Sequence, residues 1–158
     1  MASERFFALR TAAMVVAAVA SPLALAQTAA KVTASSTMIP VHGTVSGGAE
    51  SVRFAGHAQL RADVVPDDHT GGWPTAILTI DLSKVSGVGA LTGRKYVTSM
   101  QETFTRQLTA ADTVEASFPF HPMGDSDMAS ARVGTVAFHV NYNVNTLKLI
   151  GASAEIHQ

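Results

Sequence analysis

A strict alternation of small or apolar residues with mostly polar ones over Val52–Val64 is the feature that most constrains the fold. A period of two is typical of a β-strand with one face in a core and the other in solvent. Gly56 lies inside the run and predicts either a bulge or the close approach of another backbone. The side that we expect to face inward carries Val52, Phe54, Gly56, Ala58, Leu60, Ala62 and Val64.

Shorter runs of the same kind recur along the chain. Ala76–Leu82 and Val114–Phe120 alternate in the same way, and each predicts a strand. The chain ends in a predicted hairpin, in which Val136–Tyr142 leads through a turn at 143–146 to a returning strand over Leu147–Ile156. The inward residues of the returning strand change phase near Gly151, which predicts a bulge there.

Three segments give weaker patterns. Lys31–Val45 contains Pro40, which cannot donate a hydrogen bond to a neighbour, so we expect an edge strand at best. Ser86–Gly93 is rich in glycine and predicts a connection that reverses the chain. Tyr96–Leu108 fits a strand or a short helix, and its threonines favour the strand.

Many short strands between turns predict an all-β fold, namely an antiparallel β-sandwich or flattened barrel of roughly seven to nine strands. A lipocalin-like closed barrel with an internal cavity is the alternative. The small residues expected to face inward would leave room for a ligand in such a barrel, or would let two sheets pack closely. Close packing is the commoner outcome.

Residues 1–26 have the features of a signal peptide. Arg5 and Arg10 give a positive start, Thr11–Ala20 is mostly apolar, and Ala24 and Ala26 are small where a signal peptidase reads the chain. The apolar run is shorter than the roughly 20 residues that a membrane-spanning helix needs. We therefore expect a periplasmic or secreted protein with no transmembrane segment after cleavage, and one all-β domain over residues 27–158.

The composition of residues 27–158 disfavours several classes of function. Nine Lys and Arg face eleven Asp and Glu, and this balance disfavours nucleic acid or an anionic membrane as a partner, because both favour a basic face. The chain contains no cysteine, so thiol catalysis and cysteine-ligated zinc are excluded. An exported domain without disulfides depends on its core for stability.

Several segments resemble those of small exported proteins of Gram-negative bacteria that have no assigned function. The segments are Ile80–Leu82, Val85–Gly89, Tyr96–Thr98 and Phe118–Phe120 with Pro122. The resemblance spans most of the chain after the predicted signal peptide. It implies export from a bacterial cell and implies no activity.

The motifs of common enzymes are not present. Gly87, Gly89 and Gly93 do not have the spacing of a dinucleotide-binding loop, and the segment after them reads as a strand rather than a helix. The chain contains neither a Gly-x-Ser-x-Gly elbow nor a His-Glu-x-x-His pair. These patterns favour a non-enzymatic protein, and no cofactor is expected.

Two groups of residues are candidate sites. His121, Met123 and Met128 fall in one predicted polar loop, residues 121–131, and imidazole with thioether sulfur would suit copper in an oxidising compartment. Trp73 lies in the loop 66–74, and loops on a rigid β-scaffold often form binding sites. Capping the end of the core is an equally good role for Trp73.

The first hypothesis for function is an exported, non-enzymatic β-domain that acts in binding or assembly in the cell envelope. It would act through loops and an edge strand, with a protein partner or by self-association. A carrier of a small apolar ligand and a periplasmic copper-handling protein are the alternatives.

Overall fold

The computed structural model describes residues 31–67, 72–124 and 131–157. Within these residues the chain forms β-strands and turns, which confirms the predicted all-β class. The strands are β1 Thr33–Val45, β2 Val52–Val65, β3 Thr75–Asp81, β4 Val85–Gly89, β5 Lys95–Val97, β6 Gln101–Gln107, β7 Ala111–Pro122, β8 Arg132–Asn143 and β9 Lys148–His157.

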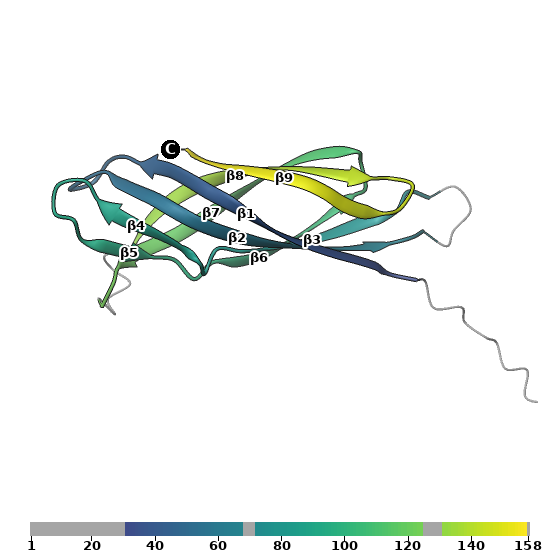
Figure 1. Cartoon of the computed structure of the whole chain (residues 1–158), viewed down its shortest axis with the longest axis horizontal. Coiled ribbons are helices and arrows are strands. Elements are labelled where there is room, and N and C mark those ends of the chain that lie inside the picture. Colours follow the sequence, from purple (N-terminus) through teal and green to yellow (C-terminus); the bar gives the residue numbers. More distant parts are fainter. Residues whose placement is uncertain (1–30, 68–71, 125–130, 158) are drawn as a thin grey trace, which may run out of the picture.

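The nine strands form one mixed sheet in the order β1-β9-β8-β7-β5-β4-β2-β3-β6. Neighbours are antiparallel except β1 and β9, which are parallel over Val41–Gly43 and Ala154–Ile156. Because β1 also pairs with β2, seven strands close into a ring, and β3 and β6 extend the sheet from β2. Figure 1 shows a flattened, elongated, nearly barrel-like molecule. The predicted flattened barrel is confirmed, and the parallel pair is an addition that the alternation did not predict.

β2 organises the sheet because it has three neighbours. One edge pairs with β1 over Val52–Val64, and the other pairs with β4 over Val52–Gly56 and then with β3 over Gln59–Val65. Gly56 lies at this change of partner, where a Cβ atom would lie 2.3 Å from the backbone oxygen of Lys84. The predicted close approach of another backbone at Gly56 is therefore confirmed.

Large aromatic side chains fill the core. Phe54, Phe118, Phe120 and Phe138 are fully buried. The ring of Phe54 contacts those of Phe118 and Phe120 edge-on, at centroid distances of 5.3 and 4.9 Å, an arrangement that aromatic quadrupoles favour. The buried cluster also contains small residues whose size lets the strands pack closely, among them Ala58, Ala62, Ala76 and Ala116.

The prediction that Lys31–Val45 forms an edge strand is wrong, because β1 lies between β2 and β9. Pro40 faces His57, whose N–H points away from β1 and toward the carbonyl of Lys84 at 3.4 Å. The two residues therefore form a non-hydrogen-bonded pair, at which β2 needs no donor from Pro40. On the other edge of β1, pairing with β9 begins only at Val41. Pro40 thus fits an interior strand without breaking a ladder.

The prediction of a connection that starts at Ser86 is also wrong for its first half, because Val85–Gly89 is strand β4. The chain reverses earlier, where the Asp81 carboxylate accepts a hydrogen bond from the backbone N–H of Ser83 at 2.8 Å. Gly87 lies within this strand. A Cβ atom at this position would lie 2.8 Å from the Phe54 ring, so a larger residue would collide with the core. This glycine therefore provides space for the core rather than a turn.

The remaining predictions concern Tyr96–Leu108 and the C-terminal hairpin. The strand interpretation of Tyr96–Leu108 is confirmed, although residues 98–100 separate β5 from β6. β8 and β9 form the predicted hairpin, and their register shifts beside Gly151 because Ile150 has no partner on β8. The bulge turns Ile150 outward, and its side chain is 66% exposed.

Candidate binding site

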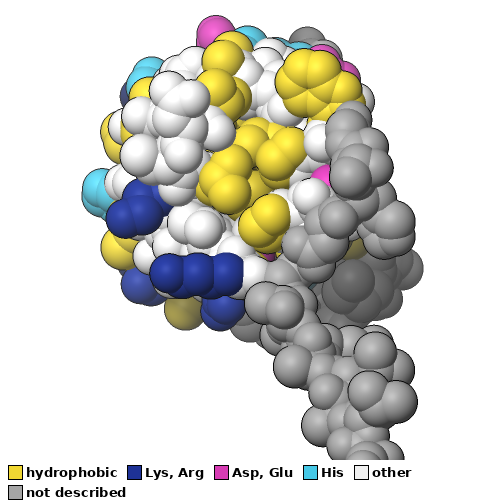
Figure 2. All heavy atoms as spheres, turned by 90° about the vertical axis from the view of Figure 1, so that its right-hand side faces the viewer, with side chains coloured by type: hydrophobic (Ala, Val, Ile, Leu, Met, Phe, Trp, Pro, Cys, Tyr) yellow, Lys and Arg dark blue, Asp and Glu magenta, His cyan; other side chains and the backbone are white. Residues whose placement is uncertain are grey.

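An apolar hollow of about 540 Å³ lies at one end of the barrel, where three connections meet. Trp73 and Pro74 lead into β3, Gln107–Ala110 join β6 to β7, and Val144 lies in the turn between β8 and β9. Figure 2 views this end of the molecule and shows hydrophobic side chains gathered at its centre, with basic side chains to one side. Segments that are far apart in the sequence therefore form one surface.

Backbone hydrogen bonds hold the three connections together. The N–H of Leu108 donates to the carbonyl of Pro74 at 2.8 Å, and the N–H of Tyr142 donates to the carbonyl of Ala110 at 2.9 Å. The side chain of Asn143 closes the β8–β9 turn by accepting two backbone N–H bonds. Each connection is therefore tied by hydrogen bonds to another connection or to a strand.

The chemistry of the hollow suits an apolar, uncharged group. All seven described residues that line it are uncharged, and the side chains of Trp73 and Val144 are 69% and 47% exposed. The hydroxyl of Thr109 already donates to the carbonyl of Ala111 at 2.8 Å. The volume lies in the range of small-molecule sites, which are mostly apolar. An exposed indole adds a large apolar surface and one N–H donor.

Trp73 was the predicted binding residue, and it is an exposed residue in the lining of this hollow. The sequence analysis missed Leu108 and Val144, which complete the surface. Leu108 is 4% exposed and continues the buried core into the hollow. A single apolar residue beside a turn gives no sign of its partners, because those partners come from other connections.

Two of the predicted copper ligands, His121 and Met123, lie at the opposite end of the barrel, and the predicted loop begins only after Pro122, where β7 ends. His121 is in β7, and its Nδ1 lies 3.1 Å from the carbonyl oxygen of Pro122. Met123 follows the strand and is 62% exposed, whereas Met128 lies outside the described residues. Within the described part of the chain, no three His, Asp or Glu side chains are grouped so that they could hold a metal ion. The copper hypothesis stays a prediction.

A buried carboxylate, which the sequence analysis also missed, lies at the end that carries His121. Glu50 is 7% exposed. Its Oε1 accepts the hydroxyls of Thr92 and Tyr96 at 2.7 and 3.0 Å, and its Oε2 accepts the N–H groups of Leu91 and Thr92 at 3.0 Å each. The Thr92 hydroxyl and then its N–H are the main reasons that the pKa of Glu50 falls from 4.5 to about 2.

Arg132 joins this network to the start of β8. Its guanidinium donates to the backbone carbonyls of Glu50 and Gly47 at 2.7 and 2.6 Å and lies 5.1 Å from the centroid of the Phe120 ring. Burial, and then the hydrogen bond to Glu50, raises the pKa of Tyr96. Because every carboxylate oxygen of Glu50 already accepts hydrogen bonds from the protein, the network holds the loops β1–β2 and β4–β5 together. It does not present a reactive group.

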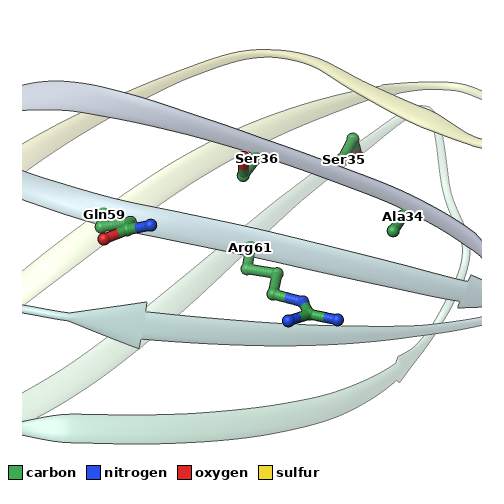
Figure 3. Close-up of a pocket in the computed structure, with 5 residues that line it drawn as sticks. All are labelled: Ala34, Ser35, Ser36, Gln59 and Arg61. Atoms are coloured by element: carbon green, nitrogen blue, oxygen red, sulfur yellow. The ribbon is translucent and has the colours of Figure 1, made fainter.

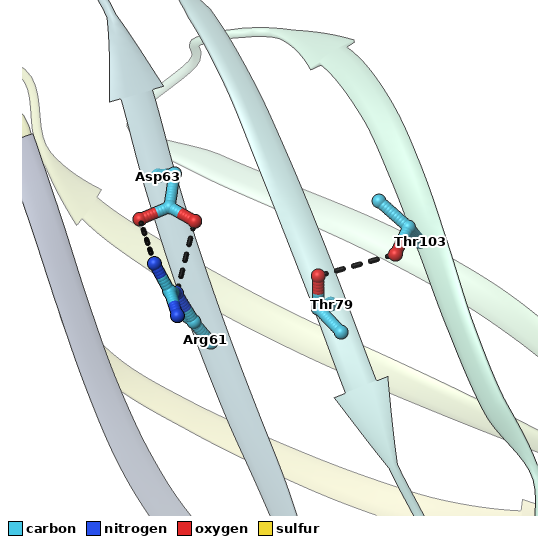
Figure 4. A network of polar contacts seen from close by, with 4 residues as sticks. All are labelled: Arg61, Asp63, Thr79 and Thr103. Carbon is cyan, nitrogen blue, oxygen red and sulfur yellow. Dashed lines mark hydrogen bonds and ion pairs between the residues drawn. The ribbon is translucent and has the colours of Figure 1, made fainter. Parts of the chain in front are cut away.

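A second, polar hollow of about 300 Å³ lies along β1 and β2. Its lining includes Ser36 and Gln59 and one charged residue, Arg61 (Figure 3). The Nε of Arg61 lies 3.0 Å from the Oδ2 of Asp63 on the same strand, and the hydroxyls of Thr79 and Thr103 lie 3.1 Å apart on the neighbouring pair β3 and β6 (Figure 4). The charge in this hollow is thus already paired, and the apolar hollow remains the better candidate.

Comparison with known proteins gives no relative from which a function could be transferred. No family model, no curated protein and no solved structure matches the chain. Residues 31–67, 72–124 and 131–157 include no helix long and apolar enough to cross a membrane. The site must therefore be interpreted from its own geometry.

Proposed function

We propose that this protein is an exported, non-enzymatic binding domain that holds a small, uncharged apolar ligand in the hollow beside Trp73. The observation that carries this proposal is the combination of a highly exposed indole with a hollow of about 540 Å³ whose described lining residues are all uncharged. Removal of apolar surface from water would drive binding, and the indole ring would stack on or against the ligand.

The same observation favours ligand binding over the other sequence-based hypotheses. The described lining of the hollow carries no charge and offers a partner little electrostatic steering, which favours a small ligand over a charged protein surface. Export is supported by the signal-peptide features of residues 1–26, which lie outside the described residues. A periplasmic or secreted location would bring the hollow into contact with apolar molecules of the envelope or its surroundings.

Trp73 provides the means of testing this proposal, because it is the only tryptophan of the chain. N-phenyl-1-naphthylamine is an uncharged apolar fluorophore that accepts energy from excited indole. We expect its addition to quench Trp73 emission and to produce sensitised probe emission that saturates. Val144→Asp places a charge in the hollow and keeps the indole, so we expect it to weaken probe binding by about tenfold or more, since an unpaired charge resists desolvation.

Val133→Asp is the matched control, because Val133 is also an exposed valine, at 63%, and lies at the far end of β8. This variant should bind the probe as the unchanged protein does. Thermal unfolding of both variants verifies that each is folded. Saturable binding that Val144→Asp leaves unchanged, or no binding to the unchanged protein, would overturn the proposal.

A further inference from the structure

β6 is the end strand of the sheet. It pairs with β3 along its whole length, Gln101–Gln107 against Thr75–Asp81, and no described strand pairs with its other edge. Six of its seven residues are exposed, and Phe104 is half-buried against the core. One edge of β6 therefore presents unpaired backbone donors and acceptors, which is the arrangement that allows another strand to add to a sheet.

The sequence of β6 is complementary to itself. It reads Gln-Glu-Thr-Phe-Thr-Arg-Gln. Read from either end, the order of residues is the same, except that glutamate stands at the second position in one direction and arginine in the other. If two copies pair antiparallel about Phe104, Glu102 of each faces Arg106 of the other. The phenylalanines then face each other, as do the threonines and the glutamines. Opposite charges and aromatic rings that face each other across two strands are stabilising pairs.

The positions of the charges argue against a purely protective role. Glu102, Phe104 and Arg106 share the face that meets Ile80, Leu78 and Ala76 of β3. Charges that point inward on an edge strand usually keep other strands away. Two charges of the same sign at positions 102 and 106 would repel each other between the copies in the symmetric arrangement. Glu102 of one copy and Arg106 of the other attract each other instead. In the described part of the chain, neither side chain has an ion pair of its own.

The same charges select one register. A shift by two residues keeps the faces of the strand but brings Phe104 opposite Glu102 or opposite Arg106 of the second copy. The carboxylate and the guanidinium then lose their partners, and the two phenylalanines no longer face each other. Register is well specified in a sheet when the side-chain pattern penalises such a shift.

We propose that the protein forms a symmetric dimer in which β6 pairs antiparallel with β6 of a second copy about Phe104. The sheet then continues from β3 and β6 of one copy into β6 and β3 of the other. Isologous contacts of this kind are the commonest form of homodimer. The proposal does not depend on a ligand in the hollow beside Trp73, and the two can be tested separately.

Charge reversal tests this dimer by sedimentation velocity over a range of protein concentrations. Glu102→Arg places Arg opposite Arg, and Arg106→Glu places Glu opposite Glu. We expect each variant alone to dimerise at least about tenfold more weakly than the unchanged chain. An equimolar mixture of the two should form heterodimers, because each arginine of one variant then faces a glutamate of the other. The double variant should dimerise as the unchanged chain does.

Glu155→Arg is the control, because Glu155 is an exposed residue of β9, a strand with neighbours on both edges. This variant should leave the dimer intact. Should either reversal fail to fold, Glu102→Gln and Arg106→Gln remove the same charges without reversing them and should weaken the dimer. A monomeric unchanged chain, or folded single variants that do not associate when mixed, would overturn the proposal.

Discussion

At the scale of single residues, the Glu50 carboxylate joins two loops that the sequence separates by about forty positions. Its four hydrogen bonds come from Leu91, Thr92 and Tyr96. Gly89 is part of the same arrangement, because a Cβ atom there would lie 2.2 Å from the Oε1 of Glu50. The sequence analysis assigned this glycine to a connection that reverses the chain, whereas in the structure it provides space for a carboxylate.

This network predicts a pH dependence of stability. The pKa of Glu50 is lowered from 4.5 to about 2 in the folded protein, so the unfolded chain takes up this proton first as the pH falls. The stabilisation is therefore complete above the ordinary pKa of 4.5 and is lost progressively toward the folded value of about 2. We expect Glu50→Gln to lower the free energy of unfolding at neutral pH and to lose its disadvantage in acid.

Chemical denaturation at a series of pH values measures this effect. Glu155→Gln is the control, because it removes an exposed carboxylate of β9 and should follow the unchanged protein throughout. A difference between the unchanged protein and Glu50→Gln that stays constant from neutral pH to strong acid would contradict the assignment of the lowered pKa to Glu50.

At the scale of elements, the junction of β2, β3 and β4 depends on Gly56. A Cβ atom at this position would lie 2.3 Å from the backbone oxygen of Lys84 and 2.7 Å from the Cα of Val85. Backbone atoms cannot rotate away as a side chain can, so we expect Gly56→Ala to cost roughly 1–3 kcal/mol of stability. Gly151→Ala adds the same methyl group where no atom lies within 4 Å.

Equilibrium unfolding of both alanine variants tests the junction. Gly151→Ala should change the free energy of unfolding by no more than about 0.5 kcal/mol, as is usual at an open position. Equal and small effects of the two substitutions would show that β4 can move away from β2, and would remove the close approach from the account of the fold.

The strands themselves were predictable, but their neighbours were not. The alternation in Val52–Val64 predicts which face of β2 is buried, and this prediction requires no knowledge of the other strands. Whether a strand lies at an edge depends on which strands pair with it, which is why Pro40 misled the prediction for β1. The parallel pairing of β1 with β9 joins opposite ends of the chain and leaves no local pattern.

The candidate site was predictable to the same limited extent. Trp73 was recognisable because a tryptophan in a polar loop is unusual in itself. Leu108 and Val144 are not unusual in their sequence context. They lie near Trp73 only because the ring of strands brings three connections to one end. Composition identifies an unusual residue, whereas the tertiary fold decides what surrounds it.

At the scale of the whole molecule, the two ends of the barrel differ in chemistry. The end around Glu50 and Arg132 is closed by polar contacts between loops. The opposite end presents Trp73 and Val144 around an apolar hollow. Among the described residues, one end is thus held by polar contacts and the other presents an apolar hollow, and loops held in place by strands often form binding sites.

Backbone amide and indole chemical shifts, recorded while N-phenyl-1-naphthylamine is added, test binding at the apolar end most directly. We expect the largest changes at the indole N–H of Trp73, at the amides of Gln107–Ala110 and at that of Val144, and none around Glu50 and Thr92. Changes centred on the Glu50 end, or spread evenly over the sheet, would contradict the assignment of the binding site to the hollow beside Trp73.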